Sequence, residues 1–203
     1  MNVNKDILIR SVLLTGSFYY FNAKSASLGE NILAVNSVLI QFLWFFSHFI
    51  DGFAFAAEAI TGKYKGARDK SGLKKAVKYL FAWGFGVSML ITVIYAVFNS
   101  GIIALLTDQQ EILILAEKYS FWVVLIPIVS FAAFVWDGIF IGTTQGKALR
   151  NAMIISTLII FVPLINILDD LMGNNGMWLA LAIFMIARGI TLFLYYPNTV
   201  LKK

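Results

Sequence analysis

Six apolar runs divide this chain, and they constrain its fold more than any other feature of the sequence. An α-helix needs about 20 predominantly apolar residues to cross the hydrocarbon core of a bilayer. Because lipid offers no hydrogen bonds to the backbone, such runs cross as helices. We therefore predict an all-α integral membrane protein, a single domain in which six transmembrane helices form one bundle. The predicted spans are residues 7–23, 32–60, 80–98, 119–141, 148–168 and 177–196.

Short polar segments separate these spans and predict where helices begin and end. We expect residues 99–101 to end the third helix and residues 169–176 to form a polar turn. Asp108, followed three residues later by Glu111, has the spacing of a capping box that opens a new helix.

The composition agrees with this fold class. Hydrophobic residues make up 60% of the 203 residues and charged residues 13%, whereas an average soluble domain has about 25% charged residues. The net charge of +5 reflects basic loops, so it does not indicate nucleic-acid binding. The chain has no cysteine, which excludes disulfides and thiolate metal sites. We expect no metal and no organic cofactor.

Basic residues are distributed unevenly between the two ends of the predicted bundle. Six spans place both termini on one side, and thirteen of the sixteen lysines and arginines fall there, including Arg10 and seven between Lys63 and Lys78. Lys24 and Lys118 fall on the other side, and Arg188 lies within the last span. Because cytoplasmic loops carry an excess of Lys and Arg, we expect a multi-pass protein of the cell (inner or plasma) membrane with both termini cytoplasmic.

Acidic residues near the end of the second span are the first indication of a site. Asp51 and Glu58 are seven residues apart, so they share one helix face, and His48 lies one turn before Asp51. Ionisable groups are costly in lipid, so we expect these acids to face a cavity or the protein interior. The alternatives are a structural hydrogen-bonded pair, a position of Glu58 among the lipid headgroups, and interfacial packing of His48 instead of a proton relay.

A further acid and a base lie in later spans. Asp137 shares one face of the fourth span with Ser130, seven residues earlier, and Arg188 lies near the middle of the sixth span. We expect Asp137 to act in cation coupling, with an ion pair to Arg188 or a helix cap as the alternative. We expect Arg188 to be a structural counter-charge and not a substrate contact.

Other polar side chains in the first, second and fourth spans are predicted to line the same cavity. They follow one face of each predicted helix, as expected for spans that surround a polar space. These residues are Thr15, Tyr19, Asn22, Gln41 and Ser130.

Four stretches of the sequence resemble the DinF-like branch of the multidrug and toxic compound extrusion (MATE) transporters. They are SASLGENILAVNSVL, DGFAFAAEAITGKYKGARD, LLTDQQEILILAEKY and WDGIFIGTTQGKALRNAM, in that order. The resemblance implies a fold in which two six-helix lobes face each other across a central cavity. This chain resembles the C-terminal lobe alone. The resemblance implies that Asp137 matches an acid that belongs to a cation site in sodium-coupled relatives. It also implies that an acidic residue of the first lobe, tied to cation coupling, is absent from this chain.

The resemblance implies multidrug or organic-cation efflux by proton- or sodium-coupled antiport, with H⁺ or Na⁺ as the coupling ion. One alternative is a flippase for lipid-linked precursors with the same fold. The cavity of such a flippase would need several bases for an anionic headgroup, and Arg188 is the one base deep in a predicted span, which favours organic cations. A second alternative is a non-transporting fragment or partner subunit. The chain has no HExxH, GxxxxGK[ST] or GxSxG motif, so we do not expect an enzyme.

The expected partners follow from the half-length resemblance. Carriers built from repeats move two units against each other around a shared site. We therefore expect this chain to pair with a complementary N-terminal six-helix lobe or with a second copy of itself. The remaining partners would be the lipid bilayer and a small organic cation, with no nucleic acid.

Overall fold

The chain folds into a bundle of long helices in a computed structural model, which describes residues 2–202. The first four helices are α1 (Asn2–Ser27), α2 (Glu30–Gly66), α3 (Lys70–Leu106) and α4 (Gln110–Gly142). A continuous helical segment follows, made of α5 (Gly146–Ile154), the π-helical η1 (Ile155–Phe161) and α6 (Val162–Met172). The last helix is α7 (Asn174–Thr199). The predicted all-helical architecture is confirmed.

Among the described residues, five helical segments are long and apolar enough to cross a membrane. They are α2, α3, α4, the continuous segment 146–172, and α7. The predicted span 7–23 lies inside α1, which is long but more polar, with Lys5, Asp6, Arg10 and Lys24 along its length. Five of the six predicted spans therefore coincide with helical segments that are long and apolar enough to cross a membrane.

Helix α3 is longer than the sequence predicts. It continues through residues 99–101 to Leu106, and it ends where Thr107 takes an extended conformation with φ −152°. At about 1.5 Å per residue, its 37 residues exceed a hydrocarbon core of about 30 Å, so its ends extend beyond that core. The polar residues Asn99 and Ser100 do not interrupt it; the Ser100 hydroxyl donates to the side-chain oxygen of Asn99.

The capping box predicted at Asp108 is wrong. The residue before α4 is Gln109, and its side chain makes no capping hydrogen bond. Glu111, which would complete the box, instead accepts a 2.6 Å hydrogen bond from the side-chain nitrogen of Asn31 on α2. The carboxylate of Glu111 thus joins two helices instead of closing its own first turn.

The polar turn predicted at residues 169–176 is also wrong in extent. Most of this segment is helical, because α6 reaches Met172 and α7 begins at Asn174. The chain reverses at Gly173, which has φ +57° and ψ −134°, a backbone conformation that favours glycine.

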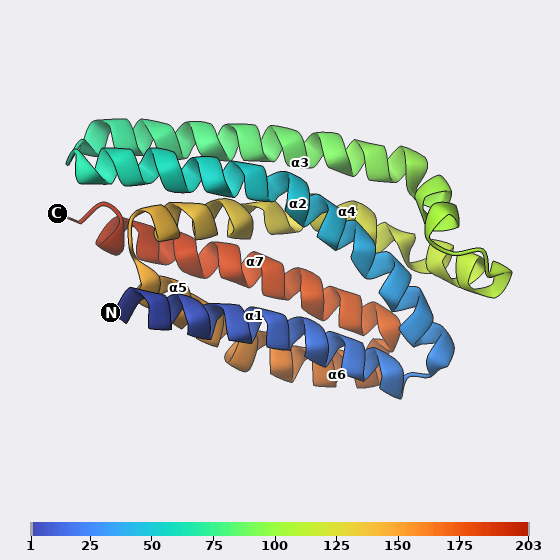
Figure 1. Ribbon diagram of the computed structural model, residues 1–203. Helices are drawn as coiled ribbons and strands as arrows, with labels where there is room; N and C mark the ends of the chain where they lie inside the picture. Colours follow the sequence, from blue (N-terminus) through green and yellow to red (C-terminus); the bar gives the residue numbers. More distant parts are fainter. Residues whose placement is uncertain (1, 203) are drawn as a thin grey trace.

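Helix α4 is the centre of the bundle and packs against α2, α3 and α7. Helices α2 and α3 run side by side, and α1 lies along α5, η1 and α6 on the other side of the bundle (Figure 1). Both termini lie at one end, together with the α2–α3 turn, as Figure 1 shows. Ion pairs fix both ends of α1: Asp6 Oδ1 lies 2.5 Å from Arg150 Nη1, and Lys24 Nζ lies 2.6 Å from Asp169 Oδ2.

Two glycines let α2 and α4 approach each other very closely. A Cβ atom on Gly138 would lie 2.2 Å from the carbonyl oxygen of Ala54, and one on Gly142 would lie 2.2 Å from that of Glu58. Small residues four apart are a common device for close helix packing in membranes. This contact places the face of α4 that carries Asp137 directly against the acidic face of α2.

Candidate functional site

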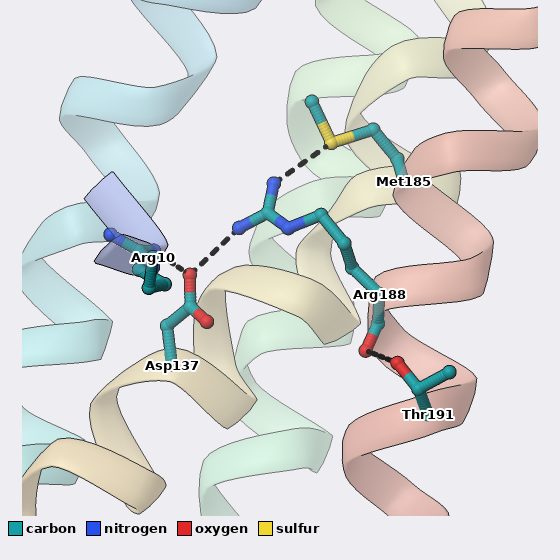
Figure 2. A network of polar contacts seen from close by, with 5 residues as sticks. All are labelled: Arg10, Asp137, Met185, Arg188 and Thr191. Atoms are coloured by element: carbon teal, nitrogen blue, oxygen red, sulfur yellow. Dashed lines mark hydrogen bonds and ion pairs between the residues drawn. The ribbon is translucent and has the colours of Figure 1, made fainter. Parts of the chain in front are cut away.

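One carboxylate joins three helices at the centre of the site. Asp137 on α4 is 5% exposed. Arg188 on α7 donates from Nη2 to Asp137 Oδ2 at 2.7 Å, and Arg10 on α1 donates from its own Nη2 to the same oxygen (Figure 2). Two guanidinium groups therefore share one carboxylate, so this cluster of three side chains carries a formal charge of +1.

Arg188 is enclosed more completely than Arg10. The Arg188 residue is 1% exposed, whereas the Arg10 side chain is 16% exposed. Arg188 also donates from Nη1 to the sulfur of Met185 at 3.2 Å, and its guanidinium lies 5.6 Å from the centre of the Phe184 ring. These contacts hold Arg188 from several sides, whereas Arg10 is held mainly by Asp137.

Each of the two arginines has hydrogen-bonding capacity left over. Arg10 Nε and Arg188 Nε are both buried without a hydrogen-bond partner among the described residues. Buried donors without partners are uncommon in proteins. The site can therefore accept a further polar group from a ligand, from water or from another chain.

A cavity of about 290 Å³ lies next to this cluster, between α1, α2, α4 and α7. Its ionisable lining residues combine the three members of the cluster with Asp51 and Glu58 of α2. Three acids and two bases leave a formal charge of −1 on the lining. Aromatic side chains complete the walls; they are Phe18, Trp44, Phe55 and Phe134. An acidic, aromatic cavity suits a small cationic ligand.

The structure places the five predicted coupling and cavity residues in two groups. Asp51, Glu58, Asp137 and Arg188 all line the cavity. His48 is exposed and does not line it; its Nδ1 lies 2.6 Å from the carbonyl oxygen of Trp44, one turn earlier. The acid pair predicted from helix spacing on α2 therefore meets Asp137 and Arg188, but without His48.

The other polar residues predicted to line the cavity lie elsewhere. On α1, the cavity face is formed by Arg10, Leu14 and Phe18, at intervals of four residues. The predicted residues Thr15, Tyr19 and Asn22 lie on a neighbouring face, because each position along a helix turns by about 100°. Gln41 is exposed on α2, and Ser130 is buried in α4 with its hydroxyl donating to the carbonyl oxygen of Ile126 at 2.5 Å; neither lines the cavity.

Sequence reasoning misses Arg10, the second base of the site. We counted Arg10 among the bases outside the membrane, although it lies inside the first predicted span. Its four-residue spacing from Leu14 was a usable signal, because an arginine in phase with apolar residues belongs to the packed face of a helix. The argument that Arg188 is the one deep base is therefore wrong, since two arginines meet at Asp137.

These features define a class of protein: a multi-pass helical membrane protein with a charged cavity enclosed between its helices. The MatE family model matches residues 7–167, which is most of the chain. The protein belongs to the MatE family.

Known relatives agree with this assignment. The chain is 37% identical over 190 residues to the DNA damage-inducible protein F of Escherichia coli (strain K12), covering 94% of this chain and 41% of that protein. It is 24% identical over 176 residues to the probable multidrug resistance protein NorM of Photorhabdus laumondii, covering 84% of this chain and 39% of that protein.

The fold is shared with a solved transporter. The outward-facing structure of a multidrug resistance MATE family transporter of the MOP superfamily matches with a TM-score of 0.85 at 19% identity. The match covers 94% of this chain and 44% of that chain. The chain therefore spans less than half the length of the relatives it matches, and it corresponds to one lobe of the solved transporter.

Proposed function

We propose that this chain is one half of an efflux transporter that exports small organic cations in exchange for H⁺ or Na⁺. The observation that carries the proposal is the net acidic cavity in which Asp137, Asp51 and Glu58 face one space between four helices. Carboxylates at membrane depth are costly unless they serve a pathway or pair with other charges. Membership of the MatE family and similarity to a probable multidrug resistance protein support the same function.

The coupling step in this proposal is a competition for Asp137. A carboxylate can hold a proton, a sodium ion or a guanidinium group, and each occupant excludes the others. Arg10 is the displaceable occupant, because it is more exposed than Arg188 and belongs to a different helix. When Arg10 leaves, Asp137 becomes available to the coupling ion while Arg188 still fixes its position.

The proposed transporter needs a second lobe. Two aromatic side chains of α2 that line the cavity are exposed, Trp44 at 40% and Phe55 at 70%, so the lobe leaves this side of the cavity uncovered. Alternating access in carriers of this kind requires two units that rock around a shared site. We propose a complementary N-terminal six-helix lobe as the partner, with a second copy of this chain as the alternative.

Efflux assays with a reconstituted pair test this proposal. The chain would be co-expressed with a complementary N-terminal six-helix lobe, and ethidium efflux from proteoliposomes would be measured under a proton or sodium gradient. Asp137→Asn is expected to abolish most of the gradient-driven efflux while the protein still inserts. Asp170→Asn, which changes an exposed acid outside the cavity, is the matched control. Normal efflux by Asp137→Asn would remove this residue from the coupling step.

A second candidate function is the translocation of a lipid-linked precursor with an anionic headgroup. The observation that favours it is the presence of two arginines at the cavity, each with an unpaired Nε. The same proteoliposomes distinguish the two functions. Movement of a fluorescent lipid-linked phosphate across the bilayer, without ethidium efflux, would support the flippase. Absence of both activities with either partner would indicate a non-transporting subunit.

A further inference from the structure

A second hollow lies on the opposite side of α4 and α7 from the charged cavity. It is an apolar groove of about 660 Å³ between α3, α4 and α7. The faces of α4 that form the two spaces do not overlap: Ala132 and Trp136 line the groove, whereas Phe134 and Asp137 line the cavity. The groove is therefore a separate feature that the proposed transport function does not use.

Small residues form the floor of the groove and aromatic rings form its walls. A Cβ atom on Gly189 would lie 3.3 Å from the Cβ of Ala132, so α4 and α7 meet closely along the floor. Trp136 stands at the centre of the wall, with ring centroids 4.6 Å from Phe81 and 5.0 Å from Tyr196. The slot is deep because Gly189 has no side chain and Ala132 has a small one, and aromatic rings form its sides.

The length of the groove matches one leaflet of a bilayer. From Ile186 to Tyr196, both in its lining, α7 rises by about 15 Å at about 1.5 Å per residue. The whole hydrocarbon core is about 30 Å thick, so the groove extends over about half of it. An extended acyl chain from one leaflet fits this length.

Two lysines stand at the mouth of the groove. Lys74 and Lys78 both line it, and their spacing of four residues places them on one face of α3. Both are exposed, and neither takes part in the ion pairs found among residues 2–202. Lys78 lies two residues before the predicted span 80–98, so the two ammonium groups lie where apolar surface gives way to polar surface. This is the level of lipid headgroups.

The surface around the groove is suited to lipid. The apolar part of α3 is only 17% buried, the lowest value among the five apolar helical segments of the described chain. Large apolar side chains that line the groove on α7 are exposed, among them Ile190 at 54% and Phe193 at 58%. Apolar patches of this kind on a membrane protein face the bilayer.

We propose that this groove binds one anionic phospholipid, with an acyl chain between Phe81, Ala132 and Gly189 and the phosphate on Lys74 and Lys78. The positive charge of the two lysines selects an anionic headgroup, and the apolar slot holds the acyl chain of the lipid. Basic pockets between transmembrane helices bind anionic lipid headgroups by the same electrostatic attraction. The bound lipid would fill the slot between α4 and α7, two helices that also carry Asp137 and Arg188.

Lipid retention by the purified full chain tests the headgroup part of the proposal. The chain in neutral detergent is supplied with equal amounts of phosphatidylglycerol and phosphatidylcholine with identical acyl chains, and bound lipid is measured by native mass spectrometry. Wild type is expected to retain phosphatidylglycerol in preference. Lys74→Gln/Lys78→Gln is expected to reduce that preference by more than about tenfold, since each lysine near the headgroups contributes about fivefold in affinity. The matched control is Lys63→Gln/Lys75→Gln, which removes equal charge from exposed residues outside the groove.

A second variant tests the slot itself. Ala132→Phe fills the floor and is expected to lower retention of both lipids, whereas Ala82→Phe, on the exposed surface of α3, leaves retention unchanged. Unchanged retention in Ala132→Phe would overturn the groove as the binding site. Because Ala132→Phe could also fail to fold, the two double-lysine variants provide an independent test. If they retain the same preference for phosphatidylglycerol over phosphatidylcholine, the proposal is overturned. Loss of lipid from wild type when a partner lobe is bound would likewise overturn it, because the groove would then be a protein interface.

Discussion

Arg188 Nη2 and Asp137 Oδ2 lie 2.7 Å apart between α7 and α4, in a place where the two side chains are 1% and 7% exposed. Each charge is stabilised by the other, because little water reaches either of them. Arg10 approaches the same carboxylate from a more exposed position. We therefore propose that the pair with Arg188 is a structural contact of the lobe and that the pair with Arg10 opens with less cost.

Removal of Arg188 is expected to destabilise the lobe strongly. Arg188→Gln leaves Asp137 with the partly buried Arg10 as its remaining arginine partner, and breaking a buried ion pair costs about 3–5 kcal/mol. The free energy of unfolding in mixed detergent micelles measures this cost. Arg150→Gln is expected to cost less, because the Arg150 side chain, at 30% exposed in its pair with Asp6, is partly screened by solvent.

The double variant Asp137→Asn/Arg188→Gln separates pairing from packing. If the two side chains are coupled, the double variant costs less than the sum of the two single variants, because the second substitution removes a contact that the first has already broken. Simple addition of the two single effects would contradict the assignment of Asp137 and Arg188 as a coupled pair.

Arg10 is expected to act on coupling more than on stability. In the proposed mechanism Arg10 competes with the coupling ion for Asp137, so Arg10→Gln should lower the concentration of coupling ion that gives half-maximal efflux. Efflux rates over a range of external pH and sodium concentration, in the paired transporter, measure this. An unchanged dependence on both ions would show that Arg10 does not compete for the carboxylate.

The close contact between α2 and α4 gives a steric prediction. Gly142→Val places methyl groups where even a Cβ would lie 2.2 Å from the carbonyl oxygen of Glu58, so the helices must separate. Overpacking of this kind costs about 1–3 kcal/mol or more. Gly86→Val on α3 is the matched control, since a Cβ there meets nothing within 4 Å. Equal unfolding free energies for the two variants would contradict the close packing.

The acids of the site and one of their partners, Arg188, could be found from sequence, whereas the second partner, Arg10, could not. Asp51 and Glu58 can be recognised because a charge at the end of a long apolar run is costly in lipid and must face a cavity or the protein interior. Arg10 was missed because it follows Lys5 and Asp6, so it reads as part of a charged terminus. Its role depends on how α1 is rotated against α4, and a sequence pattern fixes which residues share a face but not which neighbour that face meets.

The helix ends show the same limit on a smaller scale. Polar residues at 99–101 and 169–176 predict breaks, yet both segments are largely helical. Turn propensity is a local preference, and a long helix that packs on its neighbours overrides it. The contact of Gly138 and Gly142 with α2 likewise needs the partner helix to become visible, although their spacing of four residues was present in the sequence.

The last prediction concerns orientation. The two termini and the basic α2–α3 turn lie at one end of the bundle (Figure 1), and cytoplasmic segments carry the excess of Lys and Arg. A reporter fused after Lys203 is therefore expected to be cytoplasmic. A reporter inserted at Gly173, between α6 and α7, is expected on the opposite side. An alkaline phosphatase and green fluorescent protein pair measures both positions, because each is active on one side of the membrane. Phosphatase activity at Lys203 would show that the orientation is the reverse of the one expected here. It would also place Lys74, Lys78 and the mouth of the apolar groove at the outer leaflet.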